Sequence, residues 1–279
     1  MNQADNLRKM AWSARRKSFY ISVSSGKGGV GKTNFSVNLA YLMCKMGKKV
    51  LLFDADLGLA NVDIIINLTS KVNIKDFLEG KVGADSVLVK TDFGFDVVPA
   101  SSGFVSLTKL KESDYDRLLD LFVKIDSSYD YVIFDTGAGI GENVIKFSSI
   151  SDLQIVITQP EPTAVTDAYA FIKVVHNEFR LKNIYLVVNR AKTKSSGEQI
   201  YENLSSVLKK FIGVDLGFLG IIRECSEVGN SVRSQKPIVD INPDSVYSKD
   251  IVLVAKKILN LQIDRDKSLD MMNIFRGNL

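Results

Sequence analysis

Residues 24–33 read Ser24-Ser-Gly-Lys-Gly-Gly-Val-Gly-Lys-Thr33 and are the most informative part of this sequence. It contains the pattern G-x-x-x-x-G-K-T from Gly26 to Thr33, and it joins a short apolar run, Phe19–Ser24, to a helical pattern that opens at Thr33. Glycines let successive backbone N–H groups point at phosphate oxygens, and the helix N-terminus adds the positive end of its dipole. The stretch therefore predicts a strand, a phosphate-binding loop and a helix.

This loop predicts the cofactors ATP and Mg²⁺. Lys32 is expected to reach the β- and γ-phosphates, and the Thr33 hydroxyl is expected to bind the metal. The predicted ATP-binding residues of the loop are Gly26, Gly28, Gly29, Val30, Gly31, Lys32 and Thr33.

The rest of the chain continues the same alternation of strand and helix. Further apolar runs are Lys49–Phe53, Phe95–Pro99, Tyr131–Asp135, Leu153–Thr158, Ile184–Val188 and Leu216–Ile222. Helical patterns are Thr33–Met46, Ser113–Ile125, Thr163–Phe179, Gly197–Phe211 and Asp244–Leu261. Most runs are continuously apolar, as in strands buried on both faces, so the chain predicts an α/β fold with a doubly wound, mostly parallel sheet. We expect one domain over residues 19–261, with an N-terminal segment 1–18 and a C-terminal segment 262–279.

Carboxylates follow two of the apolar runs. Asp54 and Asp56 come directly after Lys49–Phe53, and Asp135 ends Tyr131–Asp135. The carboxyl ends of parallel strands meet at one edge of the sheet, which is where open α/β sheets bind ligands. Asp135 is therefore expected to hold a Mg²⁺-bound water, and the glycines after it are expected to let the following loop respond to the γ-phosphate.

With its second lysine, Lys27, the loop resembles that of the deviant Walker A ATPases, the family of MinD and ParA, whose signature K-G-G-x-G-K-[ST] is matched from Lys27 to Thr33. The resemblance implies that Lys27 reaches across a dimer interface to the partner's nucleotide, and that hydrolysis depends on dimerisation. It also implies that Asp56 positions the attacking water and that Asp54 lies near the Mg²⁺ hydration shell. Two pairs are similar to the family's adenine-recognition positions: Asn189 with Arg190, and Arg223 with Glu224.

Three strings resemble the flagellar-number branch of that family, called FlhG, YlxH or FleN. They are Asp54–Asp63, Asp135–Gly139 and Thr158–Thr163. The N-terminus is similar to that branch's D-Q-A-x-x-L-R motif, which stimulates the GTPase FlhF, although Asn2 stands where the motif has Asp. The resemblance implies an FlhF-type GTPase and flagellar C-ring proteins as partners. The predicted partner-binding residues are Gln3, Leu7 and Arg8.

The C-terminal segment has an apolar stripe for which two roles remain open. Met271, Met272, Ile274 and Phe275 lie on one side of a helical pattern and predict membrane contact. Asp264, Asp266 and Asp270 offset the few cations nearby, so docking on the body of the protein is the alternative.

The composition limits the other classes of function. Hydrophobic residues make up 46% of the 279 residues and charged residues 24%, which is typical of a globular protein, and the net charge of +4 is too small to predict nucleic-acid binding. Cys44 and Cys225 lie far apart, which favours a reducing, cytoplasmic location without a zinc or iron–sulfur site. His176 lies in a helical pattern and is expected to pack rather than catalyse.

The residues and the resemblance together predict a slow, dimer-dependent ATPase. Lys27, Lys32 and Asp56 are its expected catalytic residues, and Thr33, Asp54 and Asp135 hold Mg²⁺, the acids through water. Catalysis would be positional and electrostatic, because the set holds no strong general base. The alternatives are a division-site MinD, a ParA-type DNA-segregation ATPase, a P-loop biosynthetic ligase, or a binding module that keeps ATP without hydrolysing it.

Overall fold

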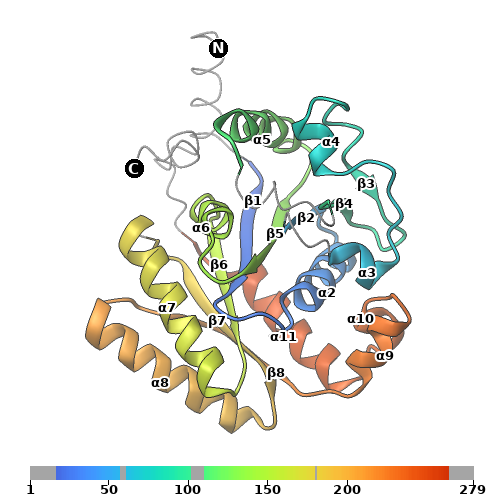
Figure 1. The fold of residues 1–279 in the computed structure, drawn as a ribbon. Helices are drawn as coiled ribbons and strands as arrows, with labels where there is room; N and C mark the ends of the chain where they lie inside the picture. Colours follow the sequence, from blue (N-terminus) through green and yellow to red (C-terminus); the bar gives the residue numbers. More distant parts are fainter. Residues whose placement is uncertain (1–16, 57–60, 102–109, 180, 264–279) are drawn as a thin grey trace.

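The fold is built on one eight-stranded sheet with the order β3-β4-β2-β5-β1-β6-β7-β8 (Figure 1). The structure is a computed structural model that describes residues 17–56, 61–101, 110–179 and 181–263. The strands are β1 Phe19–Ser25, β2 Val50–Ala55, β3 Val89–Lys90, β4 Asp96–Val98, β5 Tyr131–Ala138, β6 Leu153–Thr158, β7 Ile184–Ala191 and β8 Gly217–Arg223. All neighbouring strands are parallel except β3, which is antiparallel to β4.

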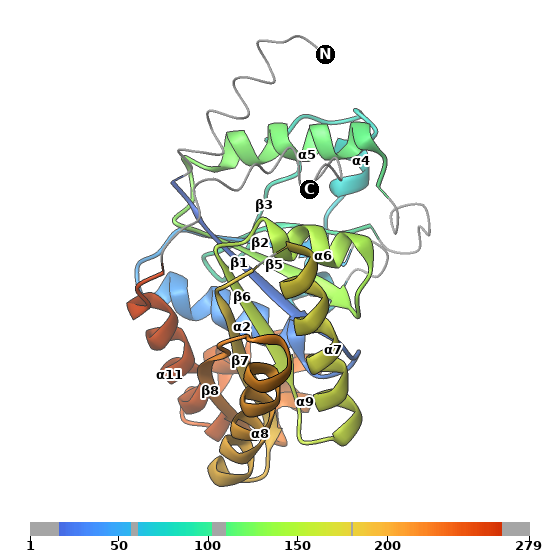
Figure 2. The ribbon, with the colours of Figure 1, turned by 90° about the vertical axis from the view of Figure 1, so that its left-hand side faces the viewer.

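Helices cover both faces of this sheet. They are α2 Lys32–Lys45, α3 Val62–Ile66, α4 Ile74–Leu78, α5 Glu112–Ile125, α6 Glu142–Ser149, α7 Pro162–Phe179, α8 Lys194–Ile212, α9 Glu227–Arg233, α10 Ile238–Ile241 and α11 Val246–Asn260. Figure 2 shows α2 and α11 on one side of the sheet, with α6 and α7 on the other. Apolar side chains of α2, α10 and α11 form one core with the sheet, while α4, α5 and α6 contribute to a second and α7 and α8 to a third. The predicted doubly wound, mostly parallel fold is confirmed.

Buried strands explain why the apolar runs were continuous. Every residue of β2 and of β6 is buried, as expected for strands covered on both faces. β1 lies between β5 and β6, so the strands that follow in the chain lie to both sides of it. The strand order therefore reverses beside the carboxyl end of β1, and a ligand cleft is expected at that point.

The structure contains short elements that the sequence pattern did not predict. They are β3 and the helices α3, α4, α6, α9 and α10. Each has at most eight residues, which is shorter than the window in which helical periodicity becomes visible. The helix α6 matters most, because it follows the carboxyl end of β5 directly and lines the candidate site.

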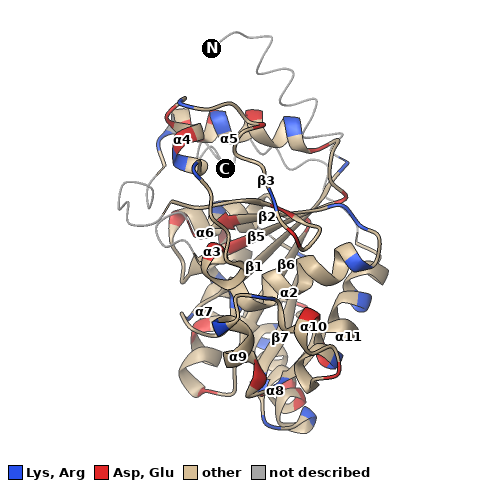
Figure 3. Ribbon diagram, turned by 90° about the vertical axis from the view of Figure 1, so that its right-hand side faces the viewer, with Lys and Arg blue, Asp and Glu red and all other residues tan. Residues whose placement is uncertain are grey.

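Figure 3 shows lysine and arginine (blue) and aspartate and glutamate (red) scattered over this side of the molecule. Within the described residues, no helix is both long enough and apolar enough to cross a bilayer.

Candidate functional site

The phosphate-binding loop fills the short connection between β1 and α2. Gly29 and Gly31 have φ angles of 76° and 96°, the left-handed region in which glycine is unstrained. A Cβ on Gly31 would lie 2.5 Å from the side-chain nitrogen of Asn189, and that nitrogen donates a hydrogen bond to the Val30 carbonyl at 2.7 Å. A Cβ on Gly26 would collide with the backbone of Asp167 in α7. The loop therefore touches β7 and α7 so closely that glycine is required at both contacts.

Lys32 lies buried at the first position of α2. Its ammonium donates a hydrogen bond to the Ser25 hydroxyl at 2.8 Å, and that hydroxyl donates to the Lys27 carbonyl at 2.6 Å. Burial lowers the pKa of Lys32, while the nearby carboxylates of Asp135 and Asp56 act in the opposite direction. Ser25 thus connects the two lysines of the loop, which the sequence pattern did not reveal.

Asp54 and Asp135 stand opposite each other at the ends of β2 and β5, where they are paired in register. The Asp54 carboxylate accepts hydrogen bonds from the backbone N–H groups of Asn61 at 3.1 Å and Val62 at 3.3 Å. Burial, and then the proximity of Asp135, raise the pKa of Asp54 well above its usual value. Two buried carboxylates this close together favour a cation between or beside them.

Asp135 is held from the side of α2. The Ser36 hydroxyl donates to its Oδ1 at 2.9 Å, and Thr33 also forms a hydrogen bond with this carboxylate. Burial raises the pKa of Asp135 to about 6, although the hydrogen bonds from Thr33 and Ser36 and the charge of Lys32 oppose the shift. Ser36 follows Thr33 by three residues, so both side chains lie on the same face of α2. This spacing could have revealed Ser36 as a second partner of Asp135.

These oxygen donors fit a magnesium ion. Hydroxyl and carboxylate oxygens are the ligands that Mg²⁺ prefers, and it usually keeps several waters and phosphate oxygens as the remaining ligands. No group of three or more His, Cys, Asp or Glu side chains arranged to hold a metal occurs in the described part of the chain. A Mg²⁺ ion here would therefore take most of its ligands from the nucleotide and from water.

An open groove of about 680 Å³ runs along the loop. Its walls are the phosphate-binding loop, the segments after β2 and β5, and the first turn of α6. Asp56 lines the groove, and its Oδ1 lies 3.4 Å from the position that a Cβ on Gly137 would take. Asn143 of α6 also lines it, and no motif in the sequence marked that residue.

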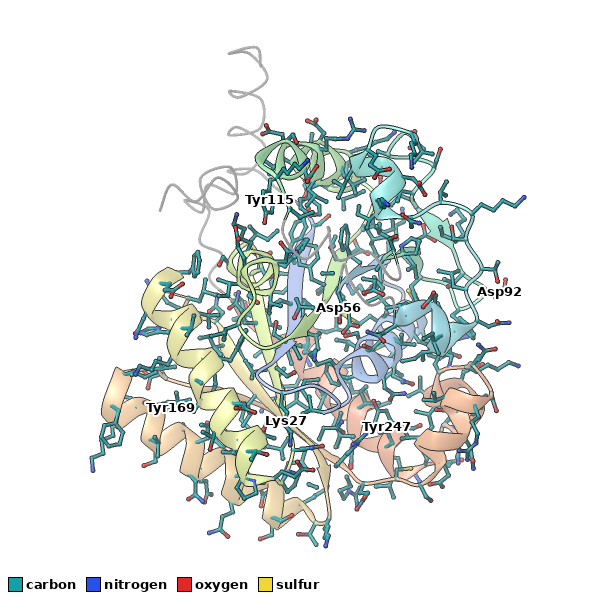
Figure 4. All side chains as sticks on the ribbon, in the orientation of Figure 1. Lys27, Asp56, Asp92, Tyr115, Tyr169 and Tyr247 are labelled. Atoms are coloured by element: carbon teal, nitrogen blue, oxygen red, sulfur yellow. The ribbon has the colours of Figure 1, made fainter. Side chains whose placement is uncertain are left out.

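Lys27 does not lie in the cradle formed by its own loop. Its ammonium donates to the Glu161 carboxylate at 2.7 Å and to the Thr163 hydroxyl at 2.9 Å, at the start of α7. The side chains of Lys27 and Glu161 are 36% and 52% exposed, and the hydrogen bond from Lys27 lowers the pKa of Glu161. Figure 4 shows Lys27 on the α7 side of the site, apart from Asp56 (Figure 4).

The two residue pairs predicted to contact adenine lie at the carboxyl ends of two neighbouring strands, β7 and β8. Asn189 and Arg190 end β7, and the Glu224 N–H donates to the Ala191 carbonyl at 2.9 Å, which ties the loop after β8 to that strand. Arg190 has a left-handed φ of 55°, which is strained for a residue with a side chain. Arg223 makes two hydrogen bonds of 2.8 Å to Asp250 of α11, so its guanidinium is engaged within the fold.

The residues predicted to contact partners and membrane lie outside the described residues. They are Gln3, Leu7 and Arg8 at the N-terminus and Met271, Met272, Ile274 and Phe275 at the C-terminus. His176 forms a hydrogen bond with the Leu181 carbonyl at 3.1 Å.

Comparison with known proteins places this geometry among P-loop proteins. The family model of an AAA domain matches residues 18–188. The chain is 36% identical to the antiactivator FleN of Pseudomonas aeruginosa over 238 residues, which is 85% of each protein. It is also 36% identical to the flagellum site-determining protein YlxH of Helicobacter pylori over 266 residues, which is 91% of this chain and 89% of that protein.

Solved structures agree with the sequence relatives. A chain of the MinC:MinD cell division protein complex of Aquifex aeolicus superposes with a TM-score of 0.72 at 29% identity, covering 88% of this chain and 98% of that one. The expected resemblance to MinD-type ATPases, and to their FleN and YlxH branch, is confirmed.

Proposed function

The chain belongs to the AAA domain family of P-loop proteins, within the MinD and ParA group of ATPases, and we propose that it is a switch that dimerises when it binds ATP. In this proposal two chains pair across their nucleotides, hydrolysis is slow, and the return to ADP separates the pair. Nucleotide binding with Mg²⁺ follows from the family, whereas the dimer and its dependence on ATP are the proposal.

The position of Lys27 carries this proposal. A single phosphate cradle needs one lysine, and buried Lys32 already occupies that place. The ammonium of Lys27 instead lies at the surface against Glu161 and Thr163. A half-exposed ion pair contributes only about 0–1 kcal/mol, so it can be exchanged for a phosphate of a second chain at little cost.

The other residues of the site divide the chemistry between them. Gly26 to Gly31 offer backbone N–H groups to the phosphates, and Lys32 leaves the Ser25 hydroxyl for the β- and γ-phosphate oxygens. Bound Mg²⁺ supplies positive charge to the phosphates, and Thr33, Asp54 and Asp135 are the residues that would hold it. Asp56, which lines the groove, orients the attacking water, and Lys27 of the second chain stabilises the negative charge of the transition state. Asn189 and Arg190 receive the adenine.

Turnover per chain as a function of protein concentration tests the proposal. If hydrolysis requires a dimer, the rate per chain rises with concentration and then saturates. In Lys27→Ala the rate per chain stays low at every concentration. The matched control is Lys48→Ala, which removes an exposed lysine just before the amino end of β2, away from the site at the carboxyl end, and should behave like the wild type. A rate per chain that does not depend on concentration would instead favour a monomeric enzyme such as a biosynthetic ligase.

The biological role that we propose is control of flagellum number or placement. Identity of 36% with both FleN and YlxH, over most of each protein, supports this role. The proposed partners are a second copy of the chain, an FlhF-type GTPase bound through Gln3, Leu7 and Arg8, and flagellar C-ring proteins. GTP hydrolysis by such a GTPase should rise when the full chain is added, and Arg8→Ala should lower this stimulation without changing ATP binding.

We further propose that the protein is cytoplasmic and reaches the membrane peripherally through segment 262–279. In this division of the chain, residues 1–18 bind the partner and residues 19–261 form the ATPase domain. Co-sedimentation with vesicles of anionic lipid, in ADP and in ATP, tests this role; Phe275→Asp should abolish an ATP-dependent increase in the bound fraction.

A division-site or DNA-segregation ATPase is the second candidate, and the superposition with a chain of the MinC:MinD complex favours it. The two candidates differ in their partner. GTPase stimulation supports the flagellar role, while ATP-dependent binding to non-specific DNA, weakened by salt, would support the segregation role.

A further inference from the structure

We propose that helix α5 couples the nucleotide groove to the root of the N-terminal segment, so that ATP binding loosens the backbone at Lys17 and Ser18. The inference rests on the proposed nucleotide switch, but it does not depend on which partner the N-terminal segment binds. Figure 1 shows α5 beside α6, and Figure 2 shows the same arrangement from the side.

The first contact joins α5 to the groove. Asn143 belongs to α6 and lines the groove together with Asp56 and the phosphate-binding loop. Its Oδ1 accepts a buried hydrogen bond of 3.1 Å from the hydroxyl of Tyr115, in the first turns of α5. The ammonium of Lys146, one turn further along α6, lies 3.9 Å from the centre of the Tyr115 ring. A displacement of α6 therefore acts directly on Tyr115.

The segment before α6 is rich in glycine and can change its backbone conformation. Gly137, Gly139 and Gly141 follow Asp135 closely, and Gly139 has a φ of 85° with no atom within 4 Å of the place where a Cβ would stand. This segment lies between the metal-binding carboxylate and Asn143. A γ-phosphate in the groove is expected to change its course, as in other nucleotide switches, and to shift the start of α6 with it.

The second contact lies at the other end of α5. Asp126 directly follows the helix, and its carboxylate accepts the backbone N–H of Lys17 at 2.9 Å and that of Ser18 at 3.0 Å. The Ser18 hydroxyl donates to the Asp126 carbonyl at 2.8 Å and lies 2.7 Å from the Tyr129 carbonyl. These bonds fix the point at which the N-terminal segment joins β1.

A helix is a suitable connection between the two contacts. Tyr115 and Asp126 are eleven residues apart, which corresponds to about 16 Å along a helix. Between them α5 packs on the sheet through apolar side chains, and apolar contacts are not directional. The helix can therefore shift slightly as a unit when the Tyr115 contact changes, and the shift strains the Asp126 contact.

The root of the N-terminal segment is far from the proposed dimer interface. The root lies just before Phe19, at the amino end of β1, and the phosphate-binding loop follows the carboxyl end of the same strand. The seven residues of β1, about 23 Å, therefore separate the root from the loop. Protection of Lys17 and Ser18 therefore reports on α5 rather than on coverage by a second chain.

Hydrogen exchange of the full-length protein tests the inference. The amides of Lys17 and Ser18 are followed with ADP and with a non-hydrolysable ATP analogue, in the presence of Mg²⁺, and the mass of the protein is measured in the same samples. In the wild type we expect these amides to exchange about tenfold faster with the analogue, because they lose hydrogen bonds to a carboxylate. In Tyr115→Phe we expect this difference to disappear while nucleotide-dependent dimerisation persists.

Tyr201→Phe is the matched control. It also removes a phenol hydroxyl that donates a hydrogen bond, in this case to the Leu216 carbonyl at 3.0 Å. Tyr201 lies on α8, which is outside the proposed connection. It should keep the full difference in exchange. If Tyr115→Phe keeps that difference as well, or if the wild type dimerises without any change at Lys17 and Ser18, the coupling is overturned. A wild type that fails to dimerise contradicts the proposed switch, and an exchange difference in that sample would still support the coupling through α5.

Discussion

Replacing Gly31 by alanine tests how tightly the phosphate-binding loop is fitted to β7. Gly31 has a left-handed φ of 96°, and a Cβ there would lie 2.5 Å from the side-chain nitrogen of Asn189. The left-handed conformation costs a residue with a Cβ about 1–2 kcal/mol. Displacing Asn189 also breaks its 2.7 Å bond to the Val30 carbonyl and leaves buried polar groups unpaired, which costs about 1–3 kcal/mol more. Gly31→Ala should therefore lower the free energy of unfolding by about 2–5 kcal/mol.

Gly47→Ala provides the matched control for the backbone part of this cost. Gly47 follows α2 with a φ of 80°, and nothing lies within 4 Å of the place where its Cβ would stand. Only the backbone penalty of about 1–2 kcal/mol applies there. Urea unfolding of both variants measures the difference, and equilibrium titration with a fluorescent ATP analogue measures binding, which should weaken by about tenfold or more in Gly31→Ala alone.

The double variant Gly31→Ala with Asn189→Ala makes the test more specific. Without the Asn189 side chain the contact disappears, so the further cost of Gly31→Ala should fall to that of Gly47→Ala. Equal stabilities of Gly31→Ala and Gly47→Ala in the wild-type background would mean that the contact with Asn189 contributes nothing, which is the opposite of the expected result.

Three more predictions concern buried polar groups, one at the root of the N-terminal segment and two at the candidate site. Asp126→Ala should lower the free energy of unfolding by about 2–4 kcal/mol, because it leaves the buried N–H of Ser18 without its acceptor. Asp126→Asn should lower it by less, because the amide oxygen of asparagine can still accept that hydrogen bond; urea unfolding of both variants checks this. Ser36→Ala should cost about 1 kcal/mol and raise the Mg²⁺ concentration needed for half-maximal ATPase activity, because Asp135 loses a 2.9 Å bond. The raised pKa of Asp135, about 6, means that the folded protein binds this proton more tightly than the unfolded chain does, so the group favours folding at low pH. In the nucleotide-free protein, the contribution of Asp135 to the free energy of unfolding, measured relative to Asp135→Asn, should fade as the pH rises from about 4 to about 6. Mg²⁺-dependent ATP binding should weaken below about pH 6, because Asp135 then becomes protonated. Calorimetry at several pH values can measure both effects.

The sequence predicted the parts of the fold that depend on long or specific patterns. The buried strands appeared as continuous apolar runs because both of their faces are covered, and the phosphate-binding loop was recognisable because its glycines and lysines have fixed spacing. Helix α6 was not predicted, since eight residues are too few to show a period.

Contacts between distant segments could not be predicted from local patterns. Nothing near Asp126 in the sequence indicates that it binds the backbone of Lys17 and Ser18, more than a hundred residues away. The ion pair of Arg223 with Asp250, which comes from a helix later in the chain, was likewise not indicated by the sequence around either residue. Such partners are set by the packing of the sheet and become visible only in three dimensions.

The mass of the protein in ADP and in ATP shows whether ATP binding makes the chain dimerise. Light scattering after size exclusion is applied to Asp56→Ala, which should retain ATP, with ADP and with ATP, and the same comparison is made after adding Lys27→Ala. We expect a monomer in ADP, a dimer in ATP, and no dimer without Lys27. An unchanged mass in ADP and ATP, or an ATP dimer that persists without Lys27, would contradict this expectation.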